Sequence, residues 1–444
     1  MSILFLVTDA YGGHGGIALF NREFCAALDE PVTVIPRVVR GPVRDVPPHV
    51  TFVAEAARNP MAYLRAITAA RLAKPELVIC GHMNLLPVAF NRPLLVVHGV
   101  EAWKRRRANL DRCRGIVSVS ALTRDRLVAW SGYAGPTHVL PNAVHLEQYG
   151  IRQKRRDLIE RYRLEGKRVL LTVGRLDSGE RSKGFDEVLE LLSDLPADVV
   201  YLIAGGGNDF ERMQQKAQAL GVIDRVRFTG LFEDADKPDL SNLADVFVMP
   251  SRGEGFGFVF LEAMACGVPV IASRNDGGRE ALLDGKLGLL VDPTNPAEIR
   301  AAILEALSRG QRRIPEGLDY FAFERFAERS RAIVAAARYT RWLVPRCLGG
   351  PRRRLARREV YRAPPAQVPR YARDAKLEEI PRGTPRNYQP PATSHRGTAP
   401  RHQPPTSQNS SGTLAPRRQL HPRASIHDPD ALSRRVRRGL GADH

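Results

Sequence analysis

Short apolar runs alternate along this chain with segments of helical periodicity, and this alternation restricts the possible folds more than any other feature. The apolar runs of the first part lie at 3–8, 32–36, 76–80, 93–98 and 115–120, and residues 17–28, 60–73 and 121–131 between them have apolar side chains at helical spacing. Short continuous apolar runs are typical of strands that are buried on both faces of a parallel sheet. The repeated order of strand and helix therefore predicts a doubly wound α/β domain.

The same alternation begins again after residue 165. Strands are predicted at 168–174, 198–205, 225–230, 245–250, 269–273 and 287–291, with helices near 183–194, 208–220, 257–267 and 296–308. We therefore predict two tandem Rossmann-like domains, an N-terminal one at 1–150 and a C-terminal one at 151–317, each with a doubly wound parallel sheet. A last helix is predicted within 318–344, after which the periodicity ends.

The composition changes at about residue 345. Residues 345–444 hold 15 of the 33 prolines and have no periodicity, which predicts a disordered tail. The tail has 21 Lys and Arg against 7 Asp and Glu, so it carries +14 of the chain's net charge of +19. Such a tail suits loose contact with a polyanion, such as an anionic membrane surface, and does not suit the reading of nucleic-acid bases.

Three features bear on the cellular compartment. The first residues, MSILFLVTDAYGG, lack the basic flank and long apolar stretch of a signal peptide, and no apolar run reaches the roughly 20 residues of a membrane-spanning helix. The five cysteines are scattered and form no CxxC pair, which argues for a reducing environment and against a structural zinc site. We expect a cytoplasmic protein that can lie at the inner face of the cell membrane.

Glycines follow the first predicted strand in the loop YGGHGGIA, at a helix start where backbone N–H groups suit a phosphate. Gly13, Gly15 and Ala18 match the G-x-G-x-x-A pattern of dinucleotide sites. The second strand is followed by Arg37 instead of an acidic residue, which would suit NADP better than NAD. The glycines can equally serve a tight turn, and both interpretations stay open at this point.

Polar residues at the predicted carboxyl ends of two strands are further candidates, because ligands of doubly wound domains bind there. Arg175 follows one strand, and Lys183 lies at the start of the next helix, where two cations would neutralise a diphosphate. His98 ends another strand in VVHGVEAW. The alternatives are a solvated charged loop for the two cations and a structural role for the histidine.

Two glutamates stand eight residues apart in RGEGFGFVFLEAMACG. In one helix, Glu254 and Glu262 would have Cα atoms about 12 Å apart and roughly 80° around the axis. A hydrolytic pair needs carboxyls about 5–9.5 Å apart across one bond, and Gly255 and Gly257 disfavour a helix through Glu254. The spacing therefore favours two carboxylates that hold different hydroxyls of one long ligand, although two exposed glutamates without a role would show the same spacing.

In combination, these stretches resemble the retaining glycosyltransferases of family four, which have the two-domain GT-B fold. The matching segments extend from residue 3 to about 308 and include GGHGGIA, HGVEAW, VSVSALTRDRL, LPNAV, VGRL, KGFDEV, LIAGGGND, DRVRFTG and ADVFVMPSRGEGFGFVFLEAMACGVPVIAS. The block SRGEGFGFVFLEAMACG is the most specific of them. The insert DSGER makes the interval between Arg175 and Lys183 longer than the commonest spacing in the family.

The resemblance implies a role for each candidate residue. Glu254 would hold hydroxyls of the donor sugar and Glu262 the ribose. Arg175 and Lys183 would bind the diphosphate and stabilise the departing nucleotide, and His98 would lie beside the reacting sugar. The residues implied to approach the donor through their backbone are Gly15, Gly16, Phe256, Gly257 and Phe258.

The resemblance therefore implies a hexosyltransferase that moves mannose or glucose from a GDP- or UDP-sugar to a glycan or lipid-linked acceptor, in exopolysaccharide or cell-envelope assembly. The donor is a substrate, so no cofactor is implied, and no metal site is expected, because no acidic DxD cluster stands at an expected place. Positioning and charge stabilisation would supply the catalysis. Two alternatives remain: an NADP-dependent oxidoreductase, and a polyanion-binding protein that acts through the basic tail.

Overall fold

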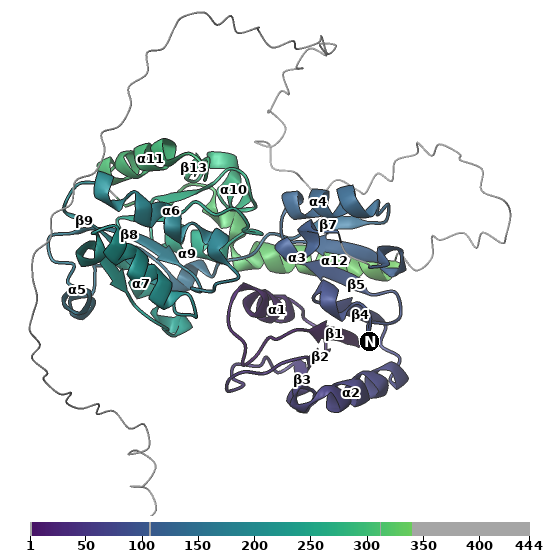
Figure 1. Cartoon of the computed structure of the whole chain (residues 1–444). Helices are drawn as coiled ribbons and strands as arrows, with labels where there is room; N and C mark the ends of the chain where they lie inside the picture. The colour runs from purple at the N-terminus through teal and green to yellow at the C-terminus, as the bar shows by residue number, and fades with distance from the viewer. Residues whose placement is uncertain (1, 106–107, 311, 340–444) are drawn as a thin grey trace, which may run out of the picture. The chain divides into compact units, whose positions relative to one another are not determined.

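Two parallel sheets form the framework of the computed structural model, which describes residues 2–105, 108–310 and 312–339 (Figure 1). The first sheet contains β1 (Ile3–Val7), β2 (Val32–Pro36), β3 (Val50–Phe52), β4 (Leu77–Cys80), β5 (Leu94–Val97), β6 (Gly115–Ser118) and β7 (Thr137–Val139). The second sheet contains β8 (Arg168–Val173), β9 (Val199–Ala204), β10 (Val226–Phe228), β11 (Val246–Met249), β12 (Val270–Ser273) and β13 (Leu289–Val291).

The strand order in each sheet creates a place for a ligand. The first sheet has the order β3-β2-β1-β4-β5-β6-β7, and the second has the order β10-β9-β8-β11-β12-β13. The described strand pairs are parallel in both sheets. The order reverses between β1 and β4 and again between β8 and β11, and ligands of such folds bind beyond the strand carboxyl ends at these reversals. The predicted fold class of two doubly wound parallel sheets is thus confirmed.

Helices connect the strands. They are α1 (Gly16–Ala26), α2 (Pro60–Leu72), α3 (Val100–Trp103), α4 (Ala121–Ser131), α5 (Arg156–Tyr162), α6 (Phe185–Glu190), α7 (Phe210–Ala219), α8 (Lys237–Leu243), α9 (Phe258–Ala265), α10 (Gly278–Ala281), α11 (Pro296–Ser308) and α12 (Phe323–Tyr339). Two of them, α2 and α11, start with a proline after an asparagine whose side chain accepts a backbone N–H of the first turn, a common start signal. No helix in the described part of the chain is long and apolar enough to cross a bilayer.

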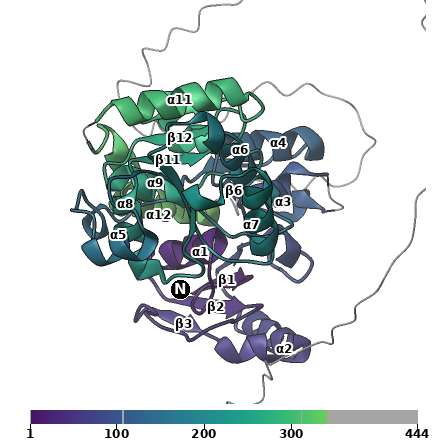
Figure 2. The same ribbon diagram turned by 60° about the vertical axis from the view of Figure 1, so that its left-hand side comes forward.

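Both faces of each sheet are buried, as the continuous apolar runs indicated. Alternate side chains of β1 belong to different clusters: Phe5 to one and Leu4 to another. In the same way, Leu171 and Leu170 of β8 lie in different clusters. Helix α11 covers part of the second sheet, where it packs on β11, β12 and β13 (Figure 2). A strand needs apolar side chains on every residue when helices lie on both of its faces.

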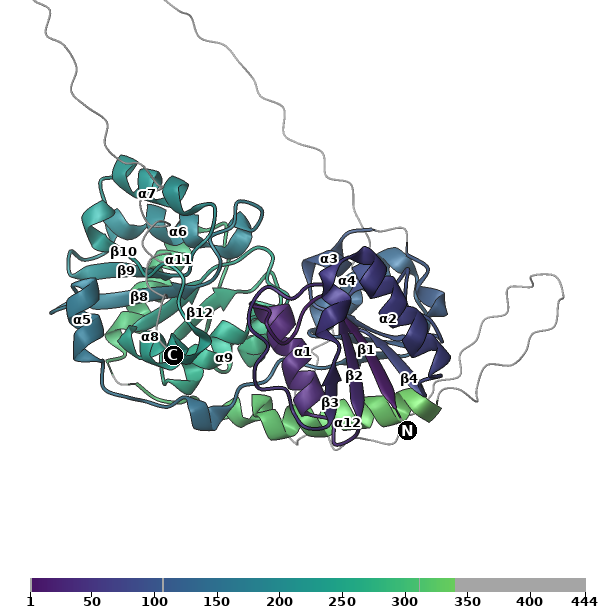
Figure 3. The ribbon, with the colours of Figure 1, turned by 90° about the horizontal axis from the view of Figure 1, so that it is seen from below.

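The last helix, α12, follows the second sheet in sequence but packs on elements of the first sheet. Its Phe326 ring lies 5.8 Å from that of Phe20 in α1, and Arg331 donates to the carbonyl oxygen of Ala27 at 3.0 Å. Figure 3 shows α12 in green alongside α1 and the strands of the first sheet. Phe326 is only 1% exposed, so this helix is part of a hydrophobic core.

Some elements were not predicted. Strands β3 and β7 have three residues each and form the two edges of the first sheet, so each leaves a weak pattern in the sequence. Helix α5 lies where a linker was expected, and α8 was also missed. The domain boundaries near residues 150 and 317 stay predictions, and the predicted tail at 345–444 lies outside the described residues.

Candidate active site

The loop between β11 and α9 carries Glu254. Gly257 in this loop has a φ of +90°, and a Cβ added there would lie 2.6 Å from the Phe260 ring, so a larger residue would strain the turn. Helix α9 begins directly after it, at Phe258. Glu254 therefore lies outside the helix, as the glycines predicted. Within the described residues, the N–H groups of Phe256, Gly257 and Phe258 have no hydrogen-bond acceptor.

Lys183 contacts Glu254 across two loops. Its Nζ lies 3.2 Å from Oε2 of Glu254 and 3.8 Å from Oε2 of Glu180. The Glu254 carboxylate raises the pKa of the Lys183 ammonium above its ordinary value, and Glu180 adds to the effect against the opposing effect of burial. The lysine follows β8, whereas the glutamate follows β11, and these two strands are neighbours in the second sheet. The structure thus brings two predicted site residues into contact.

Arg175 pairs with Glu180, which the sequence analysis did not single out. The Arg175 side chain is 64% exposed and that of Glu180 is 35% exposed. Both lie in the loop between β8 and α6 that contains the DSGER insert. The insert therefore supplies a carboxylate beside both predicted phosphate-binding cations, and a bound diphosphate would compete with it for them.

Glu262 lies on α9 and is 6% exposed. Its Oε1 accepts a hydrogen bond from Lys237 Nζ at 3.1 Å. Burial, together with the nearby charge of the Glu262 carboxylate, raises the pKa of the Tyr149 hydroxyl. Lys237 also pairs with Asp234 at 3.1 Å. Glu262 thus has two polar partners, and the sequence patterns indicated neither of them because they come from separate segments.

His98 follows β5 and lies close to the loop of Glu254. A Cβ added at Gly255 would lie 1.9 Å from the carbonyl oxygen of His98, so only glycine allows this approach of the two backbones. The ring Nε2 lies 2.9 Å from the carbonyl oxygen of Gly81 and must carry the proton, because a carbonyl only accepts. Burial lowers the pKa of His98 to about 4. The imidazole is therefore neutral at pH 7.

Gly15 and Gly16 stand at the start of α1. Gly15 has a φ of +91°, and a Cβ added at Gly16 would lie 3.7 Å from the ring of Phe258. The side chains of Phe256 and Phe258 are 1% and 8% exposed. These two aromatic residues can therefore offer a ligand little besides their backbone, and the role that the family resemblance implies for them stays a prediction.

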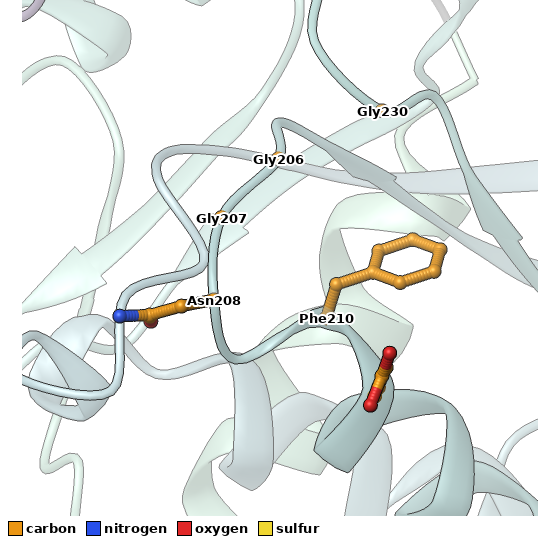
Figure 4. A pocket seen from close by; sticks show the side chains of 6 residues that line it. Gly206, Gly207, Asn208, Phe210 and Gly230 are labelled. Atoms are coloured by element: carbon orange, nitrogen blue, oxygen red, sulfur yellow. The ribbon is translucent and has the colours of Figure 1, made fainter. Parts of the chain in front are cut away.

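A pocket of about 480 Å³ opens beside the glycines that follow β9 (Figure 4). Its lining residues are Gly206, Gly207, Asn208, Phe210, Glu211 and Gly230. Nearby, a Cβ at Gly205 would lie 1.9 Å from the carbonyl oxygen of Gly174. The glycine loop therefore packs directly against the backbone that leads into Arg175. LIAGGGND was noted in the sequence only as part of the resemblance, and the packing of its glycines needed the structure.

The two doubly wound parallel sheets, with cations and carboxylates at the carboxyl ends of their strands, define an α/β protein of the GT-B type. Residues 154–316 match the model of the family described as glycosyl transferases group 1. The resemblance to the family-four glycosyltransferases is therefore confirmed.

Characterised relatives share part of their length with this chain. A GDP-mannose-dependent alpha-(1-6)-phosphatidylinositol monomannoside mannosyltransferase of Mycolicibacterium smegmatis is 35% identical over 214 residues, which are 46% of this chain and 55% of the relative. A mannosylfructose-phosphate synthase of Agrobacterium fabrum is 32% identical over 157 residues, which are 33% of this chain and 34% of the relative. The chain thus spans about half the length of the first relative and about a third of the length of the second.

Solved structures support the fold. The structure of Anabaena HepE in complex with UDP-glucose has a TM-score of 0.60 and 20% sequence identity to this chain. The superposition covers 76% of this chain and 100% of the HepE chain. At this identity the likeness concerns the fold alone.

Proposed function

We propose that this protein is a retaining glycosyltransferase that moves a hexose from a nucleoside-diphospho-sugar to a glycan or lipid-linked acceptor. The observation that carries the proposal is the contact of Lys183 with Glu254 at 3.2 Å, beside Arg175. The N–H groups of Phe256, Gly257 and Phe258 follow Glu254 and have no acceptor among the residues that the structure describes. Cations and amides suit a diphosphate, and a carboxylate suits sugar hydroxyls. A sugar nucleotide has both of these groups, a diphosphate and, bonded to it, a sugar with free hydroxyls.

In the proposed reaction, the bond between the anomeric carbon and the diphosphate oxygen breaks. A bond from the acceptor oxygen to the same carbon forms on the same face of the sugar, and the acceptor proton passes to the departing phosphate oxygen. Arg175 and Lys183 stabilise the charge that develops on the diphosphate. Diphosphate binding displaces Glu180 from Arg175, and Glu254 holds sugar hydroxyls.

The proposed donor is GDP-mannose. Support comes from the relative of Mycolicibacterium smegmatis, whose name states this donor, and from the Agrobacterium fabrum relative, whose name states a mannosyl product. Other hexoses and UDP remain within the proposed class, because the contacts of Glu254 and Lys183 do not select a sugar or a base by themselves.

The proposed acceptor is lipid-linked and lies at an anionic membrane surface. Helix α2 supports this part of the proposal, because Met61, Leu64 and Leu72 are 60%, 47% and 77% exposed. At 100° per residue, these three side chains fall within an arc of about 80°. Residues 58–74 carry four basic side chains and no acidic one. An apolar stripe flanked by cations suits the surface of an anionic bilayer.

Donor binding and transfer test the proposal together. The full chain is titrated calorimetrically with GDP, UDP and NADP, and transfer is measured with GDP-mannose, GDP-glucose and UDP-glucose. Binding of a nucleoside diphosphate, and sugar release or transfer from the matching donor with retained configuration, are the expected results. Binding of NADP without binding of GDP or UDP would contradict the proposal and favour the oxidoreductase alternative.

A further inference from the structure

Asp276 is a buried acidic residue that the proposed reaction does not use. It follows β12 and is 1% exposed. Its Oδ2 accepts hydrogen bonds from the Ser251 hydroxyl at 2.6 Å and from the Glu254 N–H at 2.9 Å, and its Oδ1 accepts one from the Gly278 N–H at 3.0 Å. One carboxyl group thus connects the loop that carries Glu254 to the start of α10.

A carboxyl group in this position is costly. Burial raises the pKa of Asp276 to about 7, although the bonds from Ser251, Glu254 and Gly278 oppose the shift. Burial of a charged or polar group disfavours the folded state unless its hydrogen bonds compensate. The three hydrogen bonds offset part of this cost, and one of them holds the backbone at Glu254.

The backbone of Glu254 is fixed on both sides. Asp276 accepts from its N–H, and its carbonyl oxygen accepts from the Gly277 N–H at 2.8 Å. A Cβ added at Gly277 would lie 2.0 Å from the carbonyl oxygen of Gly255, so the two turns touch without side chains between them. With its backbone held, Glu254 is free to move only in its side-chain torsions, and Lys183 contacts the carboxylate at the far end.

We propose that Asp276 is a positioning residue that sets the direction of the Glu254 carboxylate and thereby decides which hexose the site accepts. This inference rests on the proposed function. Asp276 touches no substrate in this scheme and acts only through the Glu254 backbone. A displacement of about 1 Å in a group that holds substrate can lower a rate about a hundredfold.

The test variant is Asp276→Asn, and the matched control is Ser251→Ala. A carboxamide has one acceptor oxygen, so either the Glu254 N–H or the Gly278 N–H would face its NH₂ group. Ser251→Ala removes a hydrogen bond from the same carboxyl group and leaves both backbone N–H groups paired. The control thus separates the positioning of Glu254 from a general weakening around Asp276.

Two readouts decide the question. The first is the ratio of kcat/KM for two donors that share the nucleotide used by the wild type, such as GDP-mannose and GDP-glucose. The second is the Kd of the free nucleoside diphosphate. In Asp276→Asn, the ratio is expected to fall at least about tenfold, a size typical of a displaced sugar contact, while the Kd changes less than about twofold. Ser251→Ala is expected to keep the wild-type ratio.

An unchanged ratio of kcat/KM for the two donors in Asp276→Asn would overturn the inference. A decrease of both this ratio and the nucleotide affinity in Asp276→Asn and in Ser251→Ala would also overturn it, because a merely structural role predicts that result. If Asp276→Asn does not fold, the same ratio is measured in Asp276→Ala, which removes both acceptor oxygens without placing an NH₂ group against an N–H. A wild-type chain that neither binds a nucleoside diphosphate nor transfers a hexose would instead overturn the proposed function.

Discussion

Lys183 has two carboxylate neighbours, Glu254 at 3.2 Å and Glu180 at 3.8 Å, and Arg175 pairs with Glu180. The cations of the candidate site are thus paired with carboxylates. The ion pair of Arg175 and Glu180 is exposed to solvent and contributes little to stability, because solvent screens it. Its removal should therefore change the binding of an anion far more than the fold.

The first prediction concerns these two cations. Arg175→Ala and Lys183→Ala should each lower kcat/KM for the donor about a hundredfold or more, as the loss of a group that stabilises developing charge does. Steady-state kinetics measures the effect, and circular dichroism checks the fold. Arg181→Ala is the matched control, because Arg181 lies in the same loop but pairs with Asp209 at 2.8 Å. Near-wild-type kinetics in both site variants would remove the cations from the mechanism.

A second prediction concerns the pH dependence of stability through His98. Its pKa is about 4 in the folded protein, below the ordinary 6.5, so the unfolded chain binds an additional proton between these values. Stability from this group is present above pH 6.5 and is lost as the pH falls toward 4. The free energy of unfolding of the wild type minus that of His98→Gln should therefore decrease by about 2 kcal/mol between pH 7 and pH 5.

Urea unfolding at the two pH values measures this difference. His98→Gln is suited to the comparison because glutamine stays neutral and keeps a donor for the Gly81 carbonyl. Other groups, such as Asp276, titrate in both proteins and cancel in the difference. A gap between wild type and variant that stays constant from pH 7 to pH 5 would mean that His98 titrates normally in the folded state.

At the scale of an element, helix α2 presents Met61, Leu64 and Leu72 to solvent, three of the eight large apolar side chains that are exposed in the described residues. The buried face of the same helix carries Tyr63 and Ile67. The helix therefore has apolar side chains on two sides, and the packing of the sheet accounts for only one of them. An exposed apolar stripe is typical of a binding surface.

The prediction for this helix is a loss of membrane binding. A variant with Met61→Gln, Leu64→Gln and Leu72→Gln should bind vesicles of phosphatidylcholine and phosphatidylglycerol at least about tenfold more weakly than wild type, since insertion of each apolar side chain contributes of order 1 kcal/mol or more. Co-sedimentation at low salt measures it. Leu220→Gln with Ile314→Gln, two exposed apolar residues outside α2, is the matched control, and equal binding by both variants would refute the role of α2.

At the scale of the whole molecule, one helix packs on elements that lie far from it in the sequence. Helix α12 follows the second sheet but packs with α1 of the first, where Phe20, Phe24 and Phe326 lie in the same core cluster. A chain that stops before α12 would leave these aromatic rings exposed to water. The elements up to α12 therefore have to be kept together in any shortened form.

The corresponding prediction is that a chain ending at Arg346 stays folded and keeps donor binding, whereas a chain ending at residue 317 loses its cooperative unfolding transition. Burial of the Phe326 side chain alone contributes about 2–3 kcal/mol, a large share of a typical net stability. Thermal unfolding and calorimetric titration with the nucleoside diphosphate compare the two chains. Loss of donor binding in the longer chain would show that residues 347–444, with their basic tail, take part in the site.

The sequence by itself determined the strands of the two sheets other than β3 and β7, because a short apolar run bounded by turn signals is a local pattern. It also determined that Glu254 lies before its helix, since Gly255 and Gly257 disfavour a helix through that residue. The identity of the candidate residues came from motif resemblance, and their roles remain predictions that the kinetics above would test.

Only the tertiary structure decided which partners these residues have. Asp276 reaches Glu254, Lys237 reaches Glu262, and Glu180 reaches Arg175 through contacts set by strand order and loop conformation. The edge strands β3 and β7 and the return of α12 to the first sheet were decided in the same way. The physical reason is that periodicity reports which face of an element is buried, whereas the neighbour on that face depends on how distant segments pack.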